Sequence, residues 1–116
     1  MREIFKDILN TDGVGGVMLF AANGDVLFKE FSTTVKTAPE HRDWRFLIES
    51  LEGMRETDLI FAKGRIYIRK TEMGYLFVLM ALYVPIAMIR LNCDILLPSL
   101  QPSKPGRKFG RFFKNK

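Results

Sequence analysis

The sequence is poor in the residues that build covalent frameworks, metal sites and catalytic triads. Its 116 residues include one cysteine, Cys93, and one histidine, His41. A lone cysteine excludes a disulfide framework and a cysteine-rich metal site within one chain. A lone histidine without clustered carboxylates supports no Ser-His-Asp or Cys-His arrangement, and a solvated position on a helix suits His41 better. The sequence therefore predicts a protein that is not an enzyme and needs no metal or cofactor.

Phosphate-binding motifs are missing as well. Gly13, Gly15 and Gly16 fit neither GxGxxG nor GxxxxGK[ST], and a strand rather than a helix follows them. We expect them to let the chain enter a crowded central strand, where a helix packs closely. Four aspartates adjoin turns, strand starts or helix residues, and turn and surface roles are expected for Asp12, Asp25, Asp58 and Asp94.

No long apolar segment stands out. The charges at Arg2, Glu3 and Lys6 interrupt the start of the chain, so we infer no export signal. Met73–Ile89 carries no formal charge over 17 residues, at the lower limit for a membrane span. Gly74, Pro85 and the β-branched and aromatic content of its first half favour a buried strand that runs into a helix. A cytoplasmic protein is expected.

Acidic residues are absent from the end of the chain. Residues 1–100 carry 12 Lys and Arg against 13 Asp and Glu, whereas residues 101–116 carry six basic and no acidic residues. This predicts one folded domain, 1–100, and a flexible tail, 101–116. The candidate polyanion-binding residues of the tail are Lys104, Arg107, Lys108, Phe109, Arg111, Phe112, Phe113, Lys114 and Lys116. Anionic membrane, nucleic acid, an acidic surface and simple solubilisation stay open, with membrane slightly ahead of nucleic acid.

Hydrophobic periodicity predicts the order α-β-β-α-β-β-β-α. Residues 1–10 have apolar residues at helical spacing, and an Asn23-Gly24 turn joins the strands Val14–Ala21 and Val26–Phe31 into a hairpin. A second helix begins near Pro39 and carries an apolar stripe down to Met54. Its stripe consists of Trp44, Leu47, Ile48, Leu51 and Met54.

Three β-rich runs follow and predict an antiparallel meander over 58–62, 65–71 and 75–83. The alternation from Arg65 to Arg69 predicts a strand with one wetter face. Pro85 starts a last helix that Pro98 and Pro102 end, and Met88, Leu91 and Ile95 make its outer sides apolar. Such a helix is broadly buried or contacts a partner.

Several strings within residues 1–100 share a common pattern. They are the leading amphipathic helix, DGVGGVMLFAANGDVLF at 12–28, the helix that contains Trp44, TDLIFAKGRIYIR at 57–69 and GYLFVLM at 74–80. With them the chain resembles the roadblock/dynein light chain family, small domains of longin- and profilin-like architecture. The resemblance implies an α+β fold in three α/β/α layers. Its five-stranded antiparallel sheet has the first and last strands central, the middle helix on one face and the terminal helices on the other.

The resemblance also implies a dimer that pairs the third strand and packs the second helix against its partner. These segments correspond to Thr57–Ala62 and Pro39–Arg55. A separate physical argument is that Leu59, Ile60 and Phe61 lie along an edge whose unpaired backbone invites another strand. The implied interface residues are Trp44, Leu47, Ile48, Leu51, Arg55, Asp58, Leu59, Ile60 and Phe61. A homodimer is favoured, and a heterodimer with a related chain stays open.

The function implied by the resemblance is non-catalytic regulation or scaffolding of a small Ras-like GTPase. A second hypothesis is an assembly module tethered to anionic membrane or nucleic acid through the tail, with peripheral membrane localisation, or a motor-complex adaptor. A small-ligand sensor ranks last, because no polar cluster in the sequence points to a pocket.

Overall fold

The computed structural model describes residues 2–31, 45–62 and 64–100. Its elements follow the predicted order. They are α1 (Lys6–Leu9), β1 (Val14–Phe20), β2 (Val26–Phe31), α2 (Arg45–Ser50), β3 (Glu56–Phe61), β4 (Gly64–Thr71), β5 (Gly74–Met80), α3 (Ile86–Leu96) and the 3₁₀ helix η2 (Leu97–Leu100). The predicted start of the second helix near Pro39, together with His41 and Trp44, lies outside the described residues.

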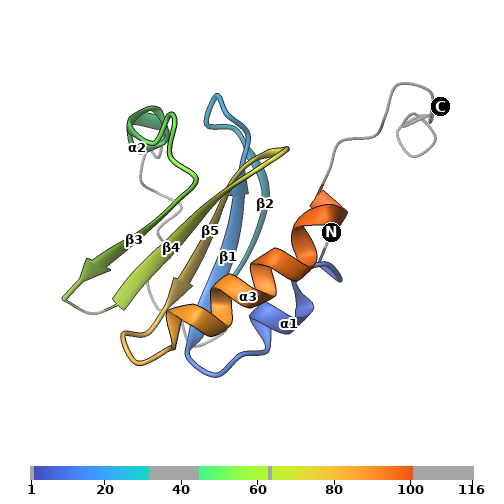
Figure 1. Ribbon diagram of the computed structural model, residues 1–116, viewed down its shortest axis with the longest axis vertical. Helices are drawn as coiled ribbons and strands as arrows, with labels where there is room; N and C mark the ends of the chain where they lie inside the picture. Colours follow the sequence, from blue (N-terminus) through green and yellow to red (C-terminus); the bar gives the residue numbers. More distant parts are fainter. Residues whose placement is uncertain (1, 32–44, 63, 101–116) are drawn as a thin grey trace.

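The strands form one antiparallel sheet in the order β2-β1-β5-β4-β3 (Figure 1). β1 and β5 lie inside the sheet, and most of their side chains are buried on both faces. The sequence prediction that the first and last strands are central is therefore confirmed. The predicted hairpin between β1 and β2 turns at Gly24, whose φ of 99° is strained for other residues.

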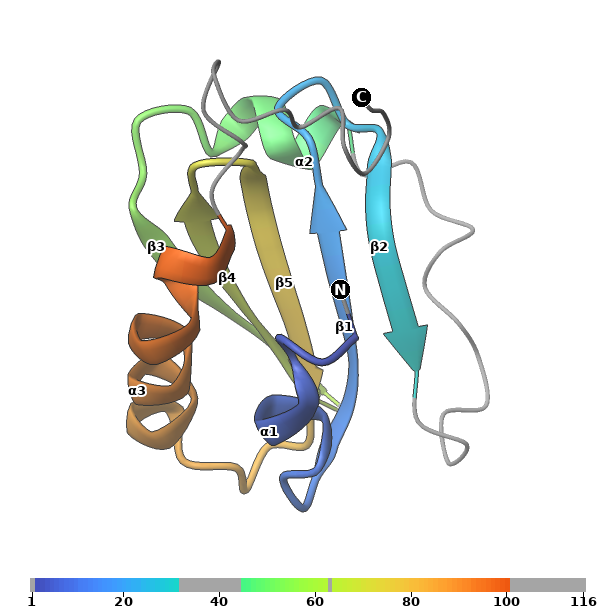
Figure 2. The same ribbon diagram turned by 90° about the vertical axis from the view of Figure 1, so that its right-hand side faces the viewer.

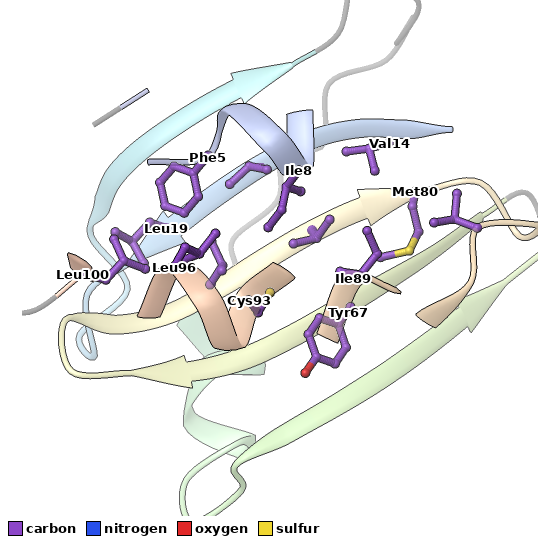
Figure 3. Close-up of a cluster of buried hydrophobic side chains, with 14 residues drawn as sticks. Phe5, Ile8, Val14, Leu19, Tyr67, Met80, Ile89, Cys93, Leu96 and Leu100 are labelled. Atoms are coloured by element: carbon purple, nitrogen blue, oxygen red, sulfur yellow. The ribbon is translucent and has the colours of Figure 1, made fainter. Parts of the chain in front are cut away.

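Two hydrophobic cores lie on opposite faces of the sheet. On one face α1 and α3 cover the sheet through Phe5, Ile8, Ile89 and Cys93 (Figures 2 and 3). On the other, Ile48 and Leu51 of the α2 region join the side chains of the alternate strand positions. The prediction of three layers with the terminal helices on the same face is confirmed.

The first helix is shorter than predicted, and the second ends earlier than predicted. Residues 2–5 form turns in place of helix, with hydrogen bonds from the amides of Phe5 and Lys6 to carbonyls three residues back. α2 ends at Ser50, and Gly53 has a φ of 87°. The prediction of Met54 on the helical stripe was wrong, because the chain has left the helix by then and Met54 is exposed.

The predicted wetter face of β4 was also wrong. Tyr67 and Arg69 alternate with Ile66 and Ile68, yet all four are buried, because the polar tips lie under α3. The predicted last strand is shorter too: β5 ends at Met80, where a turn replaces the strand expected to reach Tyr83.

Gly13, just before β1, and Gly16, within β1, have the crowded surroundings predicted, but the neighbours differ. A Cβ on Gly16 would lie 2.4 Å from the ring of Phe31 in β2, so a strand residue rather than a helix fills this space. Gly13 has a φ of 92° and lies against Tyr83 and Val84 of the β5–α3 turn. The nearly uncharged run 73–89 divides into β5, this turn and the start of α3, and no described helix is long and apolar enough to cross a membrane.

Candidate assembly surface

β3 forms an outer edge of the sheet. Its six residues pair with β4 alone among the described strands. Its other side therefore carries backbone N–H and C=O groups without a strand partner in the described part of the chain, over a length of roughly 20 Å. A second strand could complete these hydrogen bonds.

The exposed apolar part of this edge lies at the end of β3. Ile60 is 64% exposed and Phe61 is 49% exposed. Ile60 lies opposite Arg65 and shares the α3 face of the sheet, whereas Phe61 lies on the α2 face. Leu59 packs against the core on the α2 face. The edge thus offers apolar contacts on both faces beside its open backbone.

An ion pair braces the middle of β3. Two nitrogens of Arg65, Nε and Nη2, donate to the two carboxylate oxygens of Asp58 at 3.2 and 2.6 Å. A third nitrogen, Nη1, donates to the carbonyl oxygen of Leu82 at 3.3 Å, and the hydrogen bond to Asp58 raises the pKa of Arg65. Asp58, predicted at the dimer interface, already has a partner within its own chain.

A polar network holds the first residue of β3 against α3. The Tyr67 hydroxyl donates to Glu56, and Arg90 Nε of α3 donates to the same carboxylate at 3.0 Å. Arg69 donates to the Tyr67 oxygen at 3.1 Å and to Asp94 at 2.5 Å. We call these five residues the α3 clamp. The side chain of Arg69 is only 5% exposed, whereas that of Asp94 is 51% exposed.

The protonation equilibria of the clamp follow from these contacts. The hydrogen bonds from Tyr67 and Arg90 lower the pKa of Glu56. Burial, and then the hydrogen bond to Glu56, raise the pKa of Tyr67 to about 12. Burial alone would lower the pKa of Arg69, but hydrogen bonds to Asp94 and Tyr67 outweigh it and raise the pKa. At neutral pH Glu56 and Arg69 are therefore charged, Tyr67 is neutral and donates its hydroxyl proton, and the network fixes β3 relative to α3.

The predicted interface residues lie in three different environments. Ile60, Phe61, Arg55 and Asp58 are exposed. Ile48 and Leu51 are buried against the sheet within this chain, and Leu47 and Leu59 are half-buried. Trp44 and all nine predicted tail residues lie outside the described residues. Ile48 and Leu51 hold α2 against the sheet but leave almost no surface for a partner to contact. The role of each of these residues in a dimer stays a prediction.

An open cleft lies at the end of the sheet near the clamp. It has a volume of about 870 Å³ and lies between the α2–β3 connection, the β4–β5 turn and the end of α3. Arg55, Lys70 and Arg69 contribute positive charge, and Glu72 and Asp94 contribute negative charge. Because these charges nearly balance, the cleft does not select a ligand of one sign.

Sequence reasoning missed the clamp and one exposed aromatic residue. Asp94 was assigned a surface role, yet it pairs with a buried arginine. The only signal was the position of Arg69 next to Ile68 on the same strand as Ile66, because an arginine buried in such a strand needs a partner. Phe46 of α2 is 78% exposed and was not singled out, since it falls beside the helical stripe.

Comparison of sequences finds no matching family model and no matching curated protein. Comparison of structures places the chain beside proteins of the roadblock fold. One is MglB in a tetrameric arrangement, with 16% identity, a TM-score of 0.69, and 84% of this chain and 82% of that chain covered. The gliding protein MglB of Thermus thermophilus has 14% identity, a TM-score of 0.68 and coverage of 84% and 83%.

A Roadblock/LC7 domain of Streptomyces avermitilis has 10% identity and a TM-score of 0.63, with 86% of this chain and 93% of that chain covered. At such low identity the likeness concerns the fold. The chain therefore has the roadblock fold, as its sequence pattern predicted.

Proposed function

We propose that this chain is a non-catalytic regulator or scaffold of a small Ras-like GTPase, and that it works as a homodimer built on β3 and α2. The observation that carries the proposal is the open edge of β3, with exposed Ile60 and Phe61, at the end of a roadblock-type sheet. The fold shared with MglB and a Roadblock/LC7 domain supports it. MglB has a structure with a tetrameric arrangement, which supports assembly through this fold.

The dimer that the edge allows is isologous. Two antiparallel β3 strands related by a twofold axis complete each other's hydrogen bonds and extend the sheet across both subunits. With the axis perpendicular to the sheet, both copies of α3 lie on one face and both copies of α2 on the other. The clamp at Glu56 and the Asp58–Arg65 pair keep β3 straight against β4 before the partner arrives, which reduces the ordering cost of association.

A regulator of this kind acts by position. It holds a loop of the GTPase so that the GTPase's own catalytic groups meet the nucleotide, and it contributes no reacting group. A broad, rigid surface made of two subunits suits such a task better than a single small domain does.

The assembly is tested with one substitution on each outer strand of the sheet. Ile60→Glu places a charge on the β3 edge, where Arg65 lies opposite and can pair with it in the folded monomer. Val26→Glu is the matched control, since Val26 is 51% exposed on β2 at the other edge. Light scattering after size-exclusion chromatography should give a dimer for the wild type and Val26→Glu, and a monomer for Ile60→Glu.

A monomeric wild type at high concentration would overturn the dimer. So would an Ile60→Glu variant that stays dimeric while Val26→Glu dissociates, because the interface would then lie on β2.

The GTPase is tested separately. Full-length protein captures partners from the native cell in the presence of GDP or of a non-hydrolysable GTP analogue, and the captured GTPase is then purified and titrated with the chain. Binding that depends on the nucleotide supports the proposal. Equal binding in both nucleotide states, with no change in the rate of GTP hydrolysis, argues against regulation and leaves scaffolding.

A further inference from the structure

The outer face of α3 carries an apolar stripe. Met88, Leu91 and Ile95 are 39%, 58% and 67% exposed. They are spaced three and four residues apart and so share one face of the helix. We call these three residues the α3 stripe.

The stripe faces away from the sheet. The inner face of α3 is already occupied, because Ile89, Cys93 and Leu96 are buried against the sheet and α1 (Figure 3). Arg90 and Asp94, which lie beside the stripe, turn toward β3 and β4 through the clamp. The described residues leave the stripe exposed to solvent, and α3 itself lies on the outside of the molecule (Figure 2).

From the sequence and this geometry we infer that the α3 stripe is the docking site of the chain's own tail, residues 101–116. The tail begins where α3 and η2 end, and Leu100, the last described residue, is fully buried. The point at which the tail leaves the domain is therefore fixed at the end of η2, five residues after Ile95 of the stripe.

The length of the tail suits the distance. From Leu100 back to Met88 the chain rises by roughly 20 Å, along α3 at about 1.5 Å and η2 at about 2 Å per residue. Eight residues separate Leu100 from Phe109, and an extended chain of that length reaches about 26–29 Å. Phe109 and the residues after it can therefore lie over the whole stripe.

The chemistry of the two surfaces is complementary. The tail holds Phe109, Phe112 and Phe113, which would otherwise leave three aromatic rings in water. The stripe leaves three aliphatic side chains in water, and contact buries both sets. This contact is apolar and not ionic, because Asp94 beside the stripe is already paired with Arg69, and the neighbouring Arg90 carries the same charge as the tail. Because both partners belong to one chain, the effective concentration is high without a large interface.

In this contact the tail and any other ligand of the α3 stripe compete for the same three side chains. A partner that binds the basic tail, such as an anionic surface, would uncover α3, and a partner that binds α3 would release the tail. The inference does not depend on the β3 dimer, since the stripe lies on another element.

The experiment measures the proximity of the tail to Met88 in the full chain. Gly110→Cys places a nitroxide label between the phenylalanines. The native Cys93 is buried and its pKa is raised to about 12 by burial, so it stays unlabelled. With ¹³C-methyl methionine, the Met88 signal should lose most of its intensity through paramagnetic broadening. The same label in a variant with all three phenylalanines changed to serine should leave that signal largely intact.

Two further substitutions test the stripe itself. Leu91→Ser should restore the Met88 signal, whereas Val26→Ser, at a comparably exposed position on β2, should not. Equal Met88 intensity with and without the phenylalanines would overturn the proposal.

Mixed samples identify any other occupant. If a ¹³C-labelled chain without nitroxide is broadened only by a separate labelled chain, the tail of a second copy occupies the stripe and the proposal is wrong. If Met88 is broadened only by vesicles of phosphatidylcholine and phosphatidylserine that carry nitroxide lipids, lipid is the occupant, which also overturns it.

Discussion

Removal of one carboxylate, Asp94→Ala, probes the α3 clamp most directly. Asp94 accepts a hydrogen bond from Arg69 at 2.5 Å, and Arg69 is the one buried charged residue among those that the structure describes. Without Asp94 the guanidinium keeps, among the described side chains, only the Tyr67 hydroxyl as a hydrogen-bond partner. The substitution therefore leaves a buried charge that is poorly compensated.

The expected loss of stability follows from the uneven burial of the pair. Breaking a fully buried pair costs about 3–5 kcal/mol, whereas an exposed pair contributes about 0–1 kcal/mol. With Arg69 buried and Asp94 half-exposed, the loss should lie between these ranges, at about 2.5 kcal/mol. Alanine improves helix propensity by about 0.5 kcal/mol, and removal of a negative charge near the end of α3 contributes about 0.5 kcal/mol more. The net loss is then about 1.5 kcal/mol.

The assay is urea unfolding followed by circular dichroism. For a slope of about 1.5 kcal/mol per molar, the midpoint should fall by about 1 M. The double variant Arg69→Met/Asp94→Ala removes the orphaned charge and keeps an apolar side chain of similar length, so it should be more stable than Asp94→Ala alone. An Asp94→Ala variant as stable as the wild type, or a double variant less stable than the single one, would refute the reasoning.

Two further predictions concern turns and pH. Gly74→Ala should destabilise by about 3 kcal/mol or more in urea unfolding, because its Cβ would lie 1.9 Å from the Phe20 carbonyl oxygen at a φ of 140°. Gly53→Ala, with open space and a φ of 87°, should cost only about 1–2 kcal/mol, and equal losses would contradict the steric account. In the folded protein the pKa of Glu56 is lower than its ordinary value of 4.5. Glu56 therefore stabilises the fold at pH values above 4.5, and this contribution is lost as the pH falls through the lower folded pKa. Glu56→Gln should flatten this acid limb when unfolding is measured from pH 6 downward, and an unchanged limb would contradict the role of the clamp.

The central strands could be predicted from the sequence, because a strand buried on both faces is apolar at nearly every position. β1 and β5 are apolar at nearly every position, and such strands belong inside a sheet. Pro85 marked the start of α3 for the equally direct reason that proline suits the first turn. The boundary of α2 at Ser50 was less accessible, since the apolar spacing continues past the point where the backbone turns.

The candidate site was only half accessible. The exposed edge could be reasoned from Leu59, Ile60 and Phe61, because edge strands follow from their place in the meander. The clamp could not, since Arg69 and Asp94 lie 25 positions apart and their pairing depends on how α3 crosses β4. Local pattern says that Arg69 needs a partner, but it does not say which carboxylate the fold supplies.

The burial of Leu100 has a mechanical consequence. Its side chain is fully enclosed by the core that also holds Phe5 and Ile8, so the connection between domain and tail is a fixed anchor and not a loose end. A force applied to the tail would therefore act on α1 and α3 at the same time, before either helix could separate from the sheet. A shortened chain should therefore stop after Leu100, because a cut only a few residues earlier would open the core itself.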